Sequence, residues 1–98
     1  MWPRAAEIIR HTSNRWPADR AAAFGAMCLR LYLPLVDEGA STNGNIGLVM
    51  TEAATHIGVF TDNASVFEAA ISRWRAQAPA YLYLSSDGRT PRRPPLQR

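Results

Sequence analysis

The chain has 98 residues, of which 47% are hydrophobic and 19% are charged. This length suffices for one small domain, and the hydrophobic fraction excludes a wholly disordered chain. Residues 1–88 carry seven arginines against all eight acidic residues, whereas residues 89–98 add four arginines and produce the net charge of +3. Since the body of the chain is close to neutral, charge alone does not predict nucleic-acid binding.

Several classes of site lack their signature in the sequence. Cys28 is the only cysteine, so it forms no internal disulfide and is predicted to pack as a small buried hydrophobe. His11 and His56 lie far apart and have no spaced carboxylates, so we expect no metal site. We expect His56 to pack near the apolar face of its helix with one ring nitrogen hydrogen-bonded. No phosphate-binding glycine loop, HExxH motif or GxSxG motif occurs, and no cofactor is predicted.

The sequence has no apolar run long enough to span a membrane, and its first residues lack the pattern of a secretory signal. We therefore expect no membrane partner, and the chain as written would stay in the cytoplasm.

Two helices are predicted before the middle of the chain. The first covers residues 2–12, where Pro3 suits an initial helical position. The second begins at Pro17, and Pro34 should kink or end it near residues 32–33. Gly39 is the expected C-terminal cap. The buried face of this second helix is predicted to consist of Phe24, Met27, Cys28, Leu31 and Leu35.

A central helix is expected over residues 45–60, directly after a polar, glycine-containing loop. Its small residues would let other helices pack close to it. Its buried face is predicted to be Ile46, Met50, Ala53, Ile57 and Phe60.

A fourth helix follows a break at residues 61–63, capped by Asp62 or Asn63 or by a Ser65/Glu68 capping box. Pro79 should end this helix. Residues 80–84 are predicted as a short strand or an irregular extended segment, residues 85–88 as a turn, and residues 89–98 as a mobile Arg/Pro-rich tail. The face of the fourth helix is predicted to be Phe67, Ala70, Ile71, Trp74 and Ala78. The predicted class is all-α, built from helical hairpins.

The grouped polar side chains that we single out as a binding site are Asn43 and Asn45, before and at the start of the central helix. Asparagine and glycine are also common in ordinary loops and helix caps, which is the structural alternative. In the functional alternative, the amides and the helix N-terminus together bind an anionic or polar ligand. Tyr81, Tyr83 and Trp74 offer aromatic faces for sugar stacking, although the spacing of Trp74 favours a core position.

Residues 42–88 carry an ordered series of motifs that resembles the alginate lyase-like proteins, a group of polysaccharide lyases. The series comprises TNGN opening a helix, EAATHIGVF, the Asp-Asn break, the Phe…Trp-Arg helix and PAYLYLSSDG. Residues 6–39 also look like the helical hairpin that precedes this stretch in the family. Two departures from the family are clear: Ile46-Gly47 replaces the usual Trp-Glu, and no segment matches the family's downstream catalytic Tyr/His/Arg region.

The resemblance implies that residues 1–88 form part of an (α/α) toroid of about four helices, an internal fragment of such a lyase that is inactive alone. It also implies a uronic acid polymer, alginate or a related polyuronate, as partner, cleaved by β-elimination in this family. In that reaction an amide offsets the C5 carboxylate, a role that falls to Asn45 first and Asn43 second. The family is typically exported, so the resemblance and the missing signal point to different locations.

Two alternatives remain open. The chain can be a small helical interaction module that associates, with itself or with another protein, through exposed apolar faces. It can also bind nucleic acid through residues 89–98, in which case its affinity falls with salt and is lost when the tail is deleted.

Overall fold

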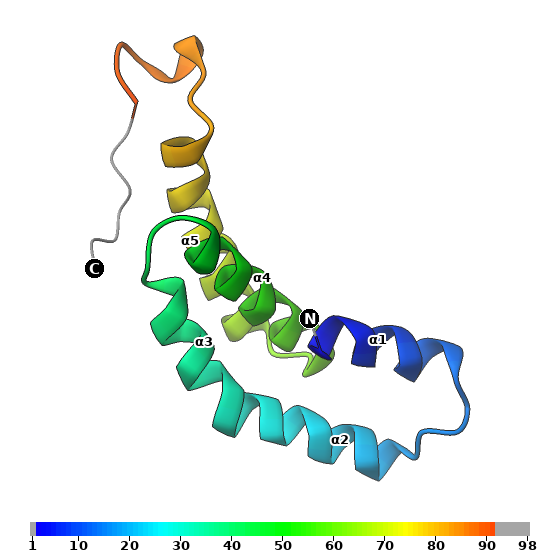
Figure 1. The fold of residues 1–98 in the computed structure, drawn as a ribbon. Coiled ribbons are helices and arrows are strands. Elements are labelled where there is room, and N and C mark those ends of the chain that lie inside the picture. The colour runs from blue at the N-terminus through cyan, green and yellow to red at the C-terminus, as the bar shows by residue number, and fades with distance from the viewer. Residues whose placement is uncertain (1, 92–98) are drawn as a thin grey trace.

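The computed structural model describes residues 2–91, and over these residues it is all-helical, without strands (Figure 1). The elements are α1 (Trp2–Thr12), α2 (Ala18–Met27), the π-helical turn η1 (Cys28–Tyr32), α3 (Leu33–Ala40), α4 (Asn45–Phe60), α5 (Ala64–Tyr81) and the 3-10 turn η2 (Ser85–Asp87). The all-α prediction is confirmed. The toroid that the resemblance implies stays a prediction.

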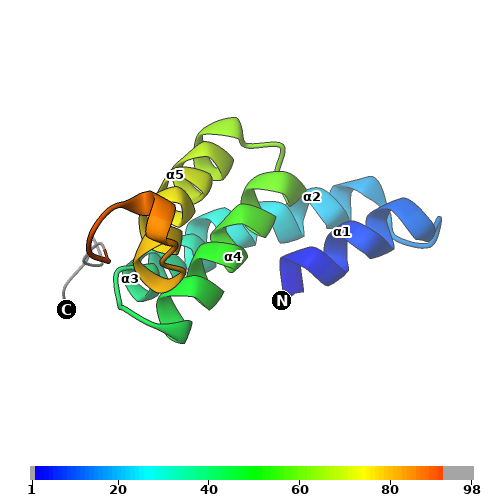
Figure 2. The same ribbon diagram turned by 90° about the horizontal axis from the view of Figure 1, so that it is seen from above.

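Helix α4 is the centre of the fold, since it packs against α1, α3 and α5 (Figures 1 and 2). Its predicted face is only partly correct, because Ile57 and Phe60 are buried whereas Ile46 is 55% exposed. The buried side is composed mainly of small residues: Gly47, Thr51, Ala54, Ile57, Gly58 and Phe60. Small side chains let the neighbouring backbones approach closely, so close approach outweighs hydrophobic bulk in deciding which side of α4 faces inward.

An aromatic cluster joins the α1–α2 hairpin to the C-terminal end of α4. The ring of Phe60 stacks on Trp16 at a centroid distance of 5.8 Å and meets Phe24 edge to face at 5.4 Å. Arg10 of α1 donates a hydrogen bond to the carbonyl oxygen of Phe60 at 2.8 Å and lies 4.7 Å from the centroid of its ring. Such edge-to-face and cation–π contacts stabilise a core beyond the area they bury.

Helices α2 and α3 form one curved rod that is interrupted before Pro34 (Figure 1). Proline has no N–H for the carbonyl four residues earlier, and the π-helical turn over residues 28–32 accommodates this loss. The predicted interruption near residues 32–33 is therefore confirmed. The prediction that Gly39 caps this rod is wrong, because α3 continues to Ala40. Gly39 instead lies against Met50, whose Cγ would be 2.8 Å from an added Cβ.

The start of α5 matches one of the caps that the sequence predicted. Asn63 is its cap, and the side-chain oxygen accepts a hydrogen bond from the backbone N–H of Val66 at 3.2 Å. The prediction that Pro79 ends α5 is wrong. Residues 80 and 81 stay helical, and the N–H of Leu82 closes the last turn on Ala78 at 2.9 Å.

The predicted inner face of α5 is also only partly correct. Ala70 is buried, but Trp74 is 52% exposed, so the core position predicted for Trp74 is wrong. The other buried residue is Gln77, which the sequence pattern did not single out.

The segment after α5 is exposed and folds on itself locally. Tyr83 donates to the carbonyl of Gly88 at 2.6 Å, and Asp87 accepts from the N–H of Leu84 at 3.1 Å. The turn predicted at residues 85–88 is confirmed, whereas a strand at residues 80–84 is wrong. Most of the predicted tail, residues 92–98, lies outside the described residues. Within residues 2–91 no helix combines the length and apolarity that a membrane crossing needs.

Candidate functional site

The two asparagines singled out by the sequence lie at the connection between α3 and α4, and both are exposed. Asn43 belongs to the connecting loop, and Asn45 is the first residue of α4. Gly44 between them is the N-cap, with φ 84° and ψ −154°, and no side chain caps the helix. Neither asparagine side chain caps α4, and a loop asparagine followed by a glycine N-cap is consistent with the structural alternative. Within residues 2–91 neither side-chain amide is engaged in a hydrogen bond.

Helix α5 holds both ends of this loop. The side-chain amide of Gln77 donates to the carbonyl of Ala40, at the end of α3, over 3.2 Å. The hydroxyl oxygen of Tyr81 accepts the N–H of Gly44, at the start of α4, over 2.8 Å. Gln77 and Tyr81 are one helical turn apart and therefore lie on the same face of α5.

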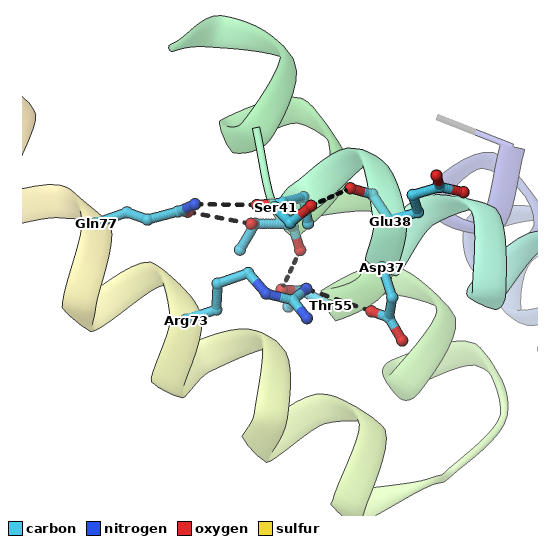
Figure 3. A network of polar contacts seen from close by, with 8 residues as sticks. Asp37, Glu38, Ser41, Thr55, Arg73 and Gln77 are labelled. Carbon is cyan, nitrogen blue, oxygen red and sulfur yellow. Dashed lines mark hydrogen bonds and ion pairs between the residues drawn. The ribbon is translucent and has the colours of Figure 1, made fainter. Parts of the chain in front are cut away.

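Gln77 also belongs to a polar network in the interior (Figure 3). Its side-chain oxygen accepts the hydroxyl of Thr51 at 3.2 Å, and both residues are almost fully buried, at 1% and 2% exposure. Near the protein surface, Arg73 of α5 pairs with Asp37 of α3 at 3.3 Å. Because the buried polar atoms of Gln77 are satisfied on two neighbouring helices, they fix how α3, α4 and α5 meet.

The backbone of the loop turns tightly onto α4. The hydroxyls of Ser41 and Thr42 donate to the carbonyls of Glu38 and Gly39, at 2.6 and 2.7 Å, and satisfy the last turn of α3. A Cβ at position 47 would overlap the carbonyl oxygen of Thr42, so only glycine fits there. A larger residue at position 47 therefore requires a different path of the loop.

The chemistry of this arrangement suits an anion. The first N–H groups of a helix point out of its N-terminus, and α4 is 16 residues long with no acidic residue in its first turn. Two neutral amides beside such a terminus can hydrogen-bond a carboxylate without bringing a positive charge.

His56 and Cys28, the other titratable side chains singled out in the sequence, have packing roles in the structure. The Nδ1 of His56 lies 2.9 Å from the carbonyl of Glu52, and the ring is partly buried, which confirms the predicted packing role with one nitrogen satisfied. Cys28 is 1% exposed, as predicted, and burial raises the pKa of its thiol. Over the part of the chain that the structure describes, no three His, Cys, Asp or Glu residues gather as metal ligands would.

Sequence reasoning missed Gln77, and it named Tyr81 only as a face for sugar stacking and not as a hydrogen-bond partner of the loop. Their i, i+4 spacing is the signal that could have identified them, but it applies only if the helix passes Pro79.

Comparisons with protein-family profiles, with curated proteins and with solved structures find no match to this chain.

Proposed function

We propose that this chain is a helical domain of the polysaccharide-lyase type whose loop at residues 42–45 binds the carboxylate of a uronic acid polymer such as alginate. The observation that carries the proposal is the pair of exposed amides of Asn43 and Asn45 at the N-terminus of a central helix, which form no hydrogen bond with residues 2–91. The substrate class comes from the motifs of residues 42–88, which resemble alginate lyase-like proteins. The arrangement as part of a toroid belongs to the same proposal.

In a β-elimination the C5 proton of the uronate becomes acidic enough to leave only when the negative charge on the adjacent carboxylate is offset. Asn45 is best placed for this task because it is the first residue of α4, where its amide and the helix N-terminus act together. Asn43 supplies a second amide from the loop. An amide accepts no proton at neutral pH, so this loop binds and polarises but does not act as the base.

Binding of saturated oligouronates tests the proposal directly. We expect the wild-type chain to bind them, and Asn45→Ala to weaken binding about tenfold, since a hydrogen bond to a charged group contributes about 1.5–3 kcal/mol. Asn43→Ala should have a smaller effect in the same direction. Titration calorimetry and the side-chain amide signals of Asn43 and Asn45 in NMR spectra measure both effects.

Asn14→Ala is the matched control, because Asn14 is an exposed asparagine in the α1–α2 turn. Equal binding by the wild type, Asn45→Ala and Asn14→Ala, or no binding by the wild type, would contradict the proposed site. Ultraviolet absorbance of the unsaturated product, followed in parallel on polyuronates, reports any turnover.

A second candidate, a self-associating helical module, is favoured by the large apolar side chains that stay exposed. Among the described residues they include Trp2, Ile8 and Ile9 on α1, Leu31, Tyr32 and Leu35 on the α2–α3 rod, and Ile46 and Val49 on α4. Leu35 is 65% and Leu31 is 54% exposed, so the buried positions predicted for both are wrong. Their i, i+4 spacing places them together along the rod. Exposed apolar surface of this extent is typical of association sites.

Self-association is decided by the mass of the chain in solution. We expect the wild type to sediment as an oligomer and the double variant Leu31→Glu/Leu35→Glu as a monomer with unchanged helical circular dichroism, because charged side chains oppose burial at an interface. A wild type that is monomeric at all concentrations would refute this candidate without affecting the binding proposal.

A further inference from the structure

We infer that Tyr81 is a positioning residue of the loop at residues 42–45, which we call the asparagine loop. Its phenol oxygen holds Gly44 and so sets the directions in which the amides of Asn43 and Asn45 point. This inference rests on the proposed function for its ligand, but the tie between Tyr81 and Gly44 can be measured without any ligand.

The contact itself joins two segments distant in sequence. The backbone N–H of Gly44 donates to the Tyr81 hydroxyl at 2.8 Å, in partly buried surroundings and across 37 residues of chain. The N–H of an N-cap residue has no partner within its own helix, so it needs one from elsewhere when water is partly excluded. Tyr81 is the partner that the fold supplies.

Gly44 needs this hydrogen bond because its backbone conformation is otherwise easily changed. Its φ of 84° lies in the region that glycine enters freely and other residues rarely adopt. A glycine there can rotate into many alternatives at low energetic cost, and it separates the two asparagines. The carbonyl of Gly44 is held by the N–H of Leu48 at 3.2 Å, the first hydrogen bond of α4. With the N–H held by Tyr81 as well, both peptide groups of Gly44 are fixed, and so are the backbone directions from which the two amides project.

The path of α5 makes this contact possible. Gln77 ties the end of α3 and Tyr81 ties the start of α4, and the two are one turn apart. This spacing on one face requires α5 to continue as a helix through Pro79, which the structure shows. If the helix ended at Pro79, as the sequence alone predicted, the side chain of Tyr81 would no longer be on the face of Gln77.

The test is Tyr81→Phe, which keeps the ring and removes the hydrogen-bond acceptor. Tyr83→Phe is the matched control, since the Tyr83 hydroxyl donates to Gly88 in the exposed segment after α5. We expect hydrogen exchange of the Gly44 amide to become about tenfold faster in Tyr81→Phe and to stay unchanged in Tyr83→Phe. Binding of saturated oligouronates should weaken by a similar factor only in Tyr81→Phe, and the ligand-induced NMR shifts of the Asn43 and Asn45 amides should shrink with it.

The possible results separate the two ideas. Unchanged Gly44 exchange in a folded Tyr81→Phe chain would show that the tie is absent, and would overturn the inference. Faster exchange with wild-type affinity would show that the tie does not position the amides, which overturns the inference as well. A wild type that binds no oligouronate would refute the proposed function, while Gly44 exchange would still decide whether Tyr81 holds the loop.

Discussion

We expect Gly58→Ala to lower the free energy of unfolding by about 2–3 kcal/mol, the cost of forcing additional atoms into a tightly packed interface. A Cβ at this position would lie 2.7 Å from the backbone nitrogen of Phe67 and 2.8 Å from its Cα. Both are backbone atoms of α5, so no rotamer change removes the overlap, and the two helices must separate. Urea unfolding followed by circular dichroism measures the loss.

Gly39→Ala is the control for this prediction, because Gly39 is also a helical glycine close to another element. The nearest atoms to its added Cβ are those of the Met50 side chain, with Cγ at 2.8 Å. A methionine side chain can rotate away, and alanine gains helix propensity of up to about 1 kcal/mol over glycine. Gly39→Ala should therefore be close to neutral. If both variants were equally stable, the close contact between α4 and α5 at Gly58 would be disproved.

The second large effect is expected for Gln77→Leu, which should lower the free energy of unfolding by about 2–3 kcal/mol. Leucine fills a similar space but leaves the carbonyl of Ala40 and the hydroxyl of Thr51 without their partner in the interior. A buried polar group left unsatisfied costs about 1–3 kcal/mol. Because Ala40 precedes the loop that carries Asn43, the same variant should also weaken oligouronate binding.

Two further variants test whether the loss of stability comes from the hydrogen-bond network or simply from placing a leucine on α5. Arg75→Leu, at an exposed position of the same helix, should change stability by no more than about 0.5 kcal/mol. Thr51→Val removes the buried hydroxyl that donates to Gln77, so the double variant Thr51→Val/Gln77→Leu should lose less than the sum of the single variants. Additive losses would argue that the hydrogen bond between the two side chains contributes nothing.

Local signals in the sequence were enough to predict where most helices lie. Proline geometry and helical periodicity predicted the start of α1 at Trp2–Pro3 and the extent of α4 over residues 45–60. Side-chain capping left several candidate starts for α5, of which Asn63 is the one observed. The interruption before Pro34 has the same local origin, since a missing N–H acts within one turn. The exposed Asn43–Asn45 loop was located for the same reason: glycine between asparagines favours a turn in any surroundings.

Tertiary packing decided which faces are buried and what holds the loop. Ile46 and Trp74 fit apolar stripes but remain exposed, because α4 packs through its small residues and these allow α5 to come close. Gln77 is buried because partners on two other helices satisfy its amide, and no periodic pattern of one helix contains that information.

The asparagine loop shows both what the sequence determines and what tertiary packing adds. The sequence by itself determined that residues 42–45 form a polar turn at the start of a helix. Only the tertiary structure decided that α5 passes Pro79 and brings Tyr81 to Gly44. The physical reason is that turn and helix preferences act over a few neighbouring residues, whereas this contact joins groups that are 37 residues apart in the chain.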